Sequence, residues 1–200
     1  FCLDWSFAAM GSTHSGAGRT VVLSSFLLGG PSGSGVATTV TIGSVAYPML
    51  ERAGYGKNAA GGLLAAAGLG AIISPPVLGA AAFLIAEFLG ISYLDVLLMA
   101  TIPTVLYYLS LFLMVELDAR KFGMRDVTAD VAYRLWPLTR RYWYHFASLV
   151  SIVVFMLLGY SPILSVFYAT LVTYAVSFLR SDTRMGLRKL VRALRDGSGQ

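Results

Sequence analysis

Polar residues divide the chain into long apolar runs, and three of these runs are long enough to cross a bilayer as helices. A transmembrane helix needs about 20 residues to cross a hydrocarbon core of ~30 Å. The runs predict transmembrane helices at roughly 93–117, 143–159 and 162–179. The last two are joined by the turn sequence Gly-Tyr-Ser-Pro at 159–162, so they form a helical hairpin.

Two further apolar runs are interrupted near the middle. In residues 57–89 the sequence Ser-Pro-Pro at 74–76 removes two backbone donors and clashes with the preceding turn, so the helix breaks there. In residues 18–50 the Gly, Ser and Pro segment 29–35 separates two arms that are each too short to span. In a soluble protein this segment would be a loop. At membrane depth such backbone needs protein or a watery cavity around it, so we predict a broken helix at 57–89 and a re-entrant helical hairpin at 18–50.

The fifteen Lys and Arg residues indicate which side of the membrane each connection faces. The predicted connections at 90–93 and 159–162 contain none of them, whereas a hairpin that enters and leaves on one side places Arg19 and Arg52 on that side. Every cation then lies in the cytoplasm, as the positive-inside rule requires. We therefore predict cytoplasmic positions for Arg52, Arg120, Arg141, Arg184 and the tail 180–200, and periplasmic positions for Tyr93 and Ser161.

The composition agrees with a chain whose main solvent is lipid. Hydrophobic residues make up 56% of the sequence and charged residues 12%, against about 25% charged residues in ordinary soluble domains. The net charge of +5 does not indicate a nucleic-acid partner, because the basic residues lie in the gaps between apolar runs. The amphipathic segments 126–141 and 183–196 predict helices on the membrane surface. The chain begins at Phe1 within an apolar run, so we expect further transmembrane helices before it.

A broken helix that faces a re-entrant hairpin is a recurrent way to build a transport site. Unwound carbonyl groups and helix C-termini coordinate a cation, and helix N-termini attract anionic substrate groups. The hydroxyls of Thr38, Thr41 and Ser74 beside these interruptions are candidate substrate ligands. Two structural alternatives stay open. Ser32 and Ser34 could instead cap the second arm of the hairpin, and the threonines could bond the preceding turn of their own helix.

Five segments of the sequence resemble a known transporter family. Residues 30–37 (GPSGSGVA) and 43–55 (GSVAYPMLERAGY) are similar to the input hairpin of TRAP transporter large permease subunits of the DctM type. Residues 70–87 (GAIISPPVLGAAAFLIAE), with Ile102-Pro103 and 116–120 (ELDAR), resemble the fused permeases of the TAXI branch. The resemblance implies an all-α polytopic membrane protein that forms half of an inverted-repeat transporter, an elevator-type importer.

The resemblance also implies an ion site. In the family a sodium ion lies between the hairpin tip and the break in the following helix. The matching positions of this sequence are Ser32, Ser34, Gly70, Ile73 and Pro75. The last three would act through main-chain carbonyl oxygens, which suit a hard cation. Gly35 stands where the family usually has Ser or Ala, and Thr38 where many members have Asn, so sodium and a proton both stay open as the coupling ion. No other cofactor is expected.

The expected function follows from the family. We expect a multi-pass permease of the bacterial inner membrane that imports a small carboxylate, such as a C4-dicarboxylate, by symport. Its partners would be a periplasmic substrate-binding protein, the remainder of the permease chain and the lipid bilayer. An ion channel-like pore and an intramembrane enzyme are the alternatives. An enzyme needs a nucleophile with a base, or a metal cluster, at membrane depth, whereas His14 and His145 lie at predicted interfaces, so we expect no enzymatic activity.

Overall fold

The computed structural model describes residues 2–10, 15–124, 136, 139–140 and 146–177, and every regular element among them is an α-helix. This confirms the all-α class expected from the sequence. The chain falls into two units, residues 1–142 and residues 143–200. Several predicted features lie wholly or partly outside the described residues and stay predictions there: the surface segments 126–141 and 183–196, the tail 180–200, and the ends of the spans 143–159 and 162–179.

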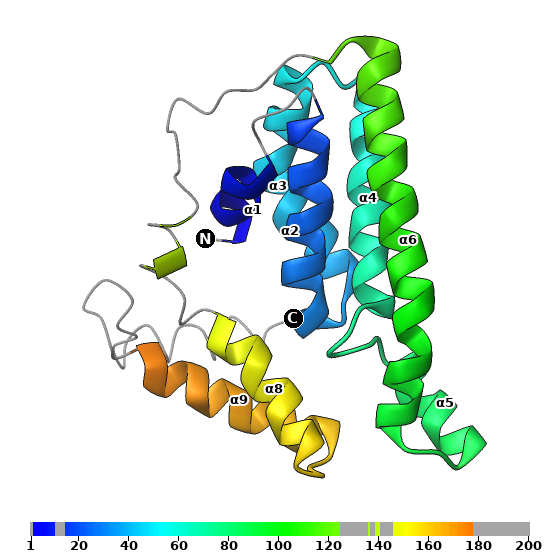
Figure 1. Cartoon of the computed structure of the whole chain (residues 1–200), viewed down its shortest axis with the longest axis vertical. Coiled ribbons are helices and arrows are strands. Elements are labelled where there is room, and N and C mark those ends of the chain that lie inside the picture. The colour runs from blue at the N-terminus through cyan, green and yellow to red at the C-terminus, as the bar shows by residue number, and fades with distance from the viewer. Residues whose placement is uncertain (1, 11–14, 125–135, 137–138, 141–145, 178–200) are drawn as a thin grey trace. The chain divides into compact units, whose positions relative to one another are not determined.

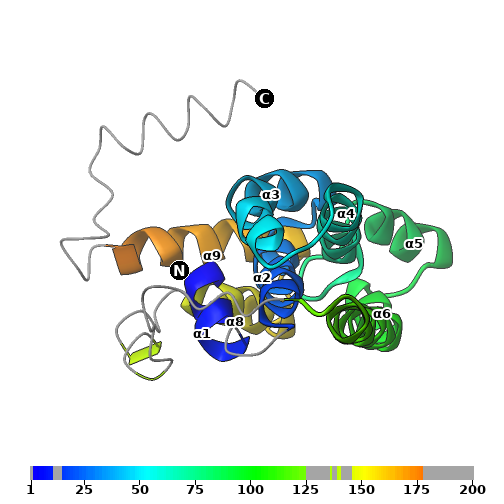
Figure 2. The same ribbon diagram turned by 90° about the horizontal axis from the view of Figure 1, so that it is seen from above.

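The first unit is a helix bundle arranged around α2 (Figure 1). Its helices are α1 (Cys2–Met10), α2 (Gly16–Ser32), α3 (Gly35–Arg52), α4 (Lys57–Ile73), α5 (Ala81–Leu89) and α6 (Tyr93–Phe122). Figure 2 shows α2 between its neighbours, and it contacts α1, α3, α4 and α6. Because α3 and α4 also pack against each other, the two arms of the α2–α3 pair are both held by α4.

A tight turn at Gly33 and Ser34 connects α2 to α3. Gly33 has a φ of 58°, a left-handed conformation that glycine adopts without steric cost, and its N–H donates to the Gly29 carbonyl (2.9 Å). The Ser34 hydroxyl accepts a backbone N–H in the first turn of α3 (3.3 Å) and so caps this helix. The result is a helical hairpin over residues 16–52, where the sequence predicted one at 18–50. Its re-entrance into the membrane stays a prediction.

The helix that follows the hairpin is interrupted at its two prolines. α4 ends at Ile73, residues 74–80 are irregular, and α5 follows. Pro75 and Pro76 have no backbone N–H to donate, so the α-helical ladder cannot continue through them. The stretch from the first residue of α4 to the last residue of α5 is 57–89, the range in which the sequence predicted a broken helix.

α6 is the longest described helix and extends past both ends of α4 (Figure 1). Its 30 residues correspond to about 45 Å, more than the ~30 Å hydrocarbon core of a bilayer. Of the described helices it is the one that is long and apolar enough to cross a membrane. The helix continues past the predicted end of the span near residue 117, to Phe122, and ends at Gly123, which has a φ of 59°, so the extent of the span itself stays a prediction. The charged residues end the apolar run, but Glu, Arg and Lys are good helix formers and do not end the helix.

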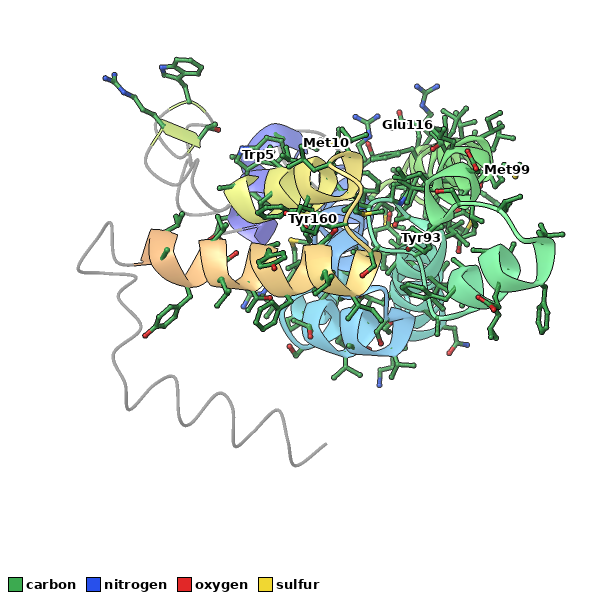
Figure 3. All side chains as sticks on the ribbon, turned by 90° about the horizontal axis from the view of Figure 1, so that it is seen from below. Trp5, Met10, Tyr93, Met99, Glu116 and Tyr160 are labelled. Atoms are coloured by element: carbon green, nitrogen blue, oxygen red, sulfur yellow. The ribbon has the colours of Figure 1, made fainter. Side chains whose placement is uncertain are left out.

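Apolar side chains divide between a packed interior and the outer face of α6. The interior is formed by buried side chains from α2, α3, α4 and α6, among them Val21, Ile42, Ala67 and Val115. The outer face of α6 carries exposed Leu, Ile, Val and Met side chains along most of its length, and Met99 points away from the other helices (Figure 3). A continuous apolar face of this kind suits lipid or another membrane helix rather than water.

The second unit contains a helical hairpin of its own. Its two described helices are α8 (Phe146–Leu157) and α9 (Pro162–Ser177), and they pack against each other. The turn between them includes Gly159, whose φ is 88°. Phe155, Tyr160 and Tyr168 form an aromatic cluster at this turn, with ring centroids 5.4–6.0 Å apart. Aromatic pairs at these distances stabilise the end of the hairpin at which the chain reverses.

Candidate functional site at the hairpin tip

The tip of the α2–α3 hairpin lies directly against the break between α4 and α5. The N–H of Val77 donates to the Gly30 carbonyl across this contact (3.1 Å). Gly33 faces the carbonyl oxygens of Val77 and Leu78, which lie 3.2 and 3.1 Å from the position that a Cβ on Gly33 would take. The two interruptions are therefore neighbours in the fold, and the irregular backbone of each covers the other.

The absence of a side chain on Gly30 permits this approach. A Cβ on Gly30 would lie 2.9 Å from the carbonyl oxygen of Pro75, which is closer than van der Waals contact. Any larger residue would push the tip away from the break. Gly61 and Gly62 of α4 differ in this respect, because a Cβ on either would meet open space.

Two hydroxyl groups meet at the tip. The Oγ of Ser32 and the Oγ1 of Thr38 are 3.1 Å apart, and the Thr38 hydroxyl also donates to the carbonyl of Ser34 in the preceding turn (2.8 Å). The Ser34 hydroxyl caps α3. The structural roles foreseen for Ser34 and Thr38 are thus both observed. Thr41 lies about one turn further along α3 with an exposed side chain, and the structure does not bring it to the Ser32–Thr38 pair.

The last carbonyl groups of α4 already have hydrogen-bond donors. The Ser74 hydroxyl donates to the Gly70 carbonyl (2.6 Å). The Thr104 hydroxyl of α6 lies within hydrogen-bond distance of the Ile73 carbonyl (2.5 Å) and of the Ala100 carbonyl in its own helix (2.7 Å), and these two acceptors share its single proton. Ser74 is fully buried, and its Oγ also lies 3.2 Å from the hydroxyl oxygen of Tyr108. The structure therefore places Gly70, Ile73 and Ser74 in a hydrogen-bonded layer between α4 and α6.

Three carbonyl groups of the break, unlike those at the end of α4, have no hydrogen-bond donor among the described residues. The carbonyl oxygens of Pro75, Val77 and Leu78 accept no hydrogen bond from the residues that the structure describes, and all three lie against glycines of the tip. Carbonyl and hydroxyl oxygens are the ligands that hard cations prefer. Within the described ranges, no three His, Cys, Asp or Glu side chains come close enough together to hold a metal ion. A cation at this contact would therefore meet neutral oxygen atoms.

Three residues of α6 that complete this region were not predicted: Tyr93, Thr104 and Tyr108. The Tyr93 hydroxyl accepts the N–H of Leu78 (3.1 Å), and its ring stacks on Phe83 with centroids 4.8 Å apart. Tyr93 lies on the side of α6 that faces the break (Figure 3). One signal was present in the sequence. Thr104 and Tyr108 are one helical turn apart, so their hydroxyls share a face of an otherwise apolar helix.

A second polar cluster lies at the base of the hairpin. Glu116 of α6 accepts hydrogen bonds from the Ser15 hydroxyl (2.7 Å) and the Arg120 guanidinium (3.0 Å), and it forms an ion pair with Arg19 of α2. From Arg19 to the tip at Ser32, α2 rises about 20 Å. The base cluster is therefore separate from the candidate site, and it joins the hairpin to the C-terminal end of α6.

Comparisons with known proteins agree with the sequence resemblance. The family model described as "Tripartite ATP-independent periplasmic transporter, DctM component" matches residues 1–198. The chain is similar to a putative TRAP transporter large permease protein of Haemophilus influenzae, with 27% identity over 122 residues, 61% of this chain and 28% of that protein. It is also similar to the 2,3-diketo-L-gulonate TRAP transporter large permease protein of Escherichia coli, with 34% identity over 92 residues, 46% of this chain and 22% of that protein. The matched stretches thus span less than a third of either relative's length.

Proposed function

Since the chain belongs to the DctM family of tripartite ATP-independent periplasmic transporters, and is therefore a membrane protein and part of a transporter, we propose that it forms half of a large permease subunit that imports a small organic acid. In this proposal the chain crosses the bacterial inner membrane several times. The remainder of the permease supplies the second half of the transport site. A periplasmic binding protein delivers the substrate, and the chain itself catalyses no chemical reaction.

The contact between the hairpin tip and the helix break is the observation that carries this proposal. The end of α4 is bonded to the central part of α6, through Thr104 and Ile73. α5 and the N-terminal part of α6 extend beyond the tip (Figure 1). If α6 spans the bilayer, the tip lies within it and does not reach the far surface. Unwound backbone at that depth, covered by protein, is the feature from which membrane transporters build ion and substrate sites.

We propose that a hard cation such as sodium binds between the tip and the break. The proposed ligands are the Ser32 hydroxyl and the carbonyl oxygens of Pro75, Val77 and Leu78, with Ser34 at the edge of the contact. The oxygens of Gly70 and Ile73, expected from the family, could join only by sharing their second lone pair, because each already accepts a hydroxyl. Residues 29–38 and 70–80 contain no carboxylate, imidazole or amine, which favours a metal ion over a proton.

The proposed substrate is a small carboxylate. α3 begins at the tip, so the positive end of its dipole faces the contact and would attract an anionic group. Thr38 and Thr41 are the hydroxyls that we propose for substrate contact. Thr41 is the accessible one of the two, because Thr38 is buried and its hydroxyl is bonded to Ser32 and Ser34. Ser74, although proposed from the sequence, is fully buried against Tyr108 and is better placed to support the break. The name of the Escherichia coli relative specifies a keto-sugar acid, 2,3-diketo-L-gulonate, which is an organic acid of this general class.

Uptake by the reconstituted system tests the proposal. The full-length permease is placed in proteoliposomes, its binding protein is added outside, and a panel of labelled C4-dicarboxylates and sugar acids is offered. We expect uptake of one class of acid that requires both the binding protein and an inward sodium gradient. A pH gradient alone should not replace sodium. Flux that needs neither the binding protein nor any gradient would contradict the proposal and indicate a channel-like pore.

A further inference from the structure

A cavity of about 500 Å³ opens at the base of the hairpin. It is lined by Ser15 and Arg19 at the start of α2 and by Glu116, Ala119, Arg120, Gly123 and Met124 at the end of α6. We call it the base pocket. A cavity of this volume is large enough for a small ligand or for the polar headgroup of a lipid. It is distinct from the proposed ion site, which lies about 20 Å away along α2.

The charges of the base pocket do not balance. Glu116 is its one carboxylate among the lining residues, and both guanidinium groups bind to it, so the lining retains one positive charge. Arg120 reaches Glu116 through Nε, and its terminal N–H groups have no acceptor in the described part of the chain. Its side chain is 76% exposed, against 31% for Arg19. Glu116 therefore holds two guanidinium groups close together while leaving donors for an added anion.

The depth of the base pocket limits what that anion can be. If α6 spans the bilayer and enters the hydrocarbon core at Tyr93, about 20 of its residues cover the ~30 Å core, and Glu116 and Arg120 then lie at the level of the lipid headgroups. Between Asp95 and Arg120 the exposed residues of α6 carry no charge and most of them are apolar, Leu117 being the last before Arg120. The pocket also has an apolar part, since Ala119 and Met124 are buried in its wall. A ligand with a phosphate next to a hydrocarbon portion fits both features.

We propose that the base pocket binds the phosphodiester headgroup of an acidic phospholipid. Guanidinium groups bind phosphate oxygens through paired N–H donors, and Arg120 and Arg19 offer such donors from two different helices. Basic pockets between helices at the membrane surface are a known kind of acidic-headgroup site. The bound lipid bridges α2 and α6 in parallel with Glu116, and so braces the base of the hairpin against the spanning helix.

Lipid-dependent stability of the full-length permease tests this inference. The thermal unfolding midpoint of delipidated protein in neutral detergent is measured during titration with phosphatidylglycerol, with phosphatidylcholine and with inorganic phosphate. We expect phosphatidylglycerol to raise the midpoint at concentrations at which the other two do not. Arg120→Gln should raise the phosphatidylglycerol concentration needed for half of this shift about fivefold, because one cationic side chain near the surface is lost. The matched control is Arg52→Gln, which removes an exposed cation of α3 that does not line the pocket.

Each other outcome overturns the inference. If Arg120→Gln and Arg52→Gln weaken phosphatidylglycerol binding equally, binding depends only on the net charge of the protein. Saturation by inorganic phosphate alone would assign the pocket to a soluble phosphate, and saturation by a small dicarboxylate would assign it to transported substrate. If Arg120→Gln does not fold, Arg120→Lys keeps the charge but loses the paired donors, and it should bind phosphatidylglycerol more weakly than the wild type. Native mass spectrometry gives an independent count of the lipid molecules that stay bound to the permease.

Discussion

Single glycines and hydroxyls determine how closely the hairpin tip and the helix break approach each other. The contact is made by backbone atoms, through the Val77–Gly30 hydrogen bond and the carbonyl groups that face Gly33. A side chain would have to be accommodated between two segments that are both irregular. Tight packing of this kind tolerates added volume poorly, because neither backbone can move without losing hydrogen bonds.

The first prediction concerns Gly30. In Gly30→Ala the new Cβ would lie 2.9 Å from the carbonyl oxygen of Pro75, so the tip must shift away from the break. We expect the sodium concentration for half-maximal uptake to rise about tenfold, since overpacking of this kind costs about 1–3 kcal/mol. The control is Gly62→Ala, where the Cβ meets open space and a helix interior gains a better helix former. Equal sodium dependence in the two variants would argue against an ion at this contact.

The second prediction concerns Tyr55, in the connection between α3 and α4. Its hydroxyl is buried, and it has no hydrogen-bond partner among the described residues. Burial, with a smaller contribution from the charge of Asp118, raises the pKa of Tyr55 from 10 to about 12. Below pH 10 the hydroxyl is protonated in the folded and the unfolded protein. Between pH 10 and 12 the unfolded protein releases the proton while the folded protein keeps it, so the folded state loses stability as the pH rises.

Thermal unfolding of Tyr55→Phe at pH 8 and pH 11 checks this prediction. At pH 8 we expect the variant to be as stable as the wild type or slightly more stable, because an unsatisfied buried hydroxyl is removed. At pH 11 the wild type should lose more stability than the variant. Tyr47→Phe, which retains Tyr55, should behave like the wild type. A clear loss of stability of Tyr55→Phe at pH 8 would show that the hydroxyl has a partner, such as a buried water.

Sequence and structure agree at the residue scale where a role depends on neighbours along the chain. Ser34 as a helix cap and Thr38 bonded to the preceding turn involve partners three and four positions away, so the sequence alone could suggest both. The engagement of the Ile73 carbonyl could not be predicted. Its donor, Thr104, is 31 positions further along the chain, and the contact depends on how α6 packs against α4.

At the scale of elements, α6 supports the helix break. Thr104 bonds the last carbonyl of α4, Tyr108 contacts Ser74, and Tyr93 accepts the N–H of Leu78. One helix thus meets groups on both sides of the prolines, which lack N–H groups of their own. The existence and position of the broken helix could be predicted from Ser-Pro-Pro, because proline acts locally. The support from α6 could not, since hydropathy treats Tyr and Thr within an apolar run as ordinary membrane residues.

The third prediction tests this support. Thr104→Val keeps the shape of the side chain but leaves the Ile73 carbonyl without its α6 donor. We expect a loss of about 1 kcal/mol in stability, the usual value of one hydrogen bond, and faster hydrogen exchange of the Val77 and Gly79 amides. Thr101→Val is the control, because its exposed hydroxyl bonds only the carbonyl of Leu97 in its own helix. If both variants exchange at the wild-type rate, α6 does not hold the break.

At the scale of the whole molecule, topology follows from charge placement. The connections 90–92 and 158–161, between consecutive described helices, contain no Lys or Arg, whereas the C-terminal ends of α3 and α6 carry Arg52, Arg120 and Lys121. Because α2 and α3 form a hairpin, the start of α2 and the end of α3 lie at the same end of the first unit, with Arg19 and Arg52. A single orientation therefore puts these cations on one side, which the positive-inside rule assigns to the cytoplasm.

The last prediction is the sidedness that this orientation implies. Cys2, the one cysteine of the chain, is first replaced by Ala, and single cysteines are then introduced at Ser92, Ser161 and Lys121, which are all exposed. Ser92 and Ser161 lie in the connections without cations, so in intact spheroplasts both should react with a membrane-impermeant maleimide. Lys121 lies at the opposite end of α6, about 45 Å from Ser92 along the helix, so its cysteine should react only after the membrane is permeabilised. The reverse pattern would invert the orientation, and it would place the base of the hairpin in the periplasm. Labelling of all three positions in intact cells would mean that α6 does not cross the membrane, and the proposed depth of the hairpin tip would then have no support.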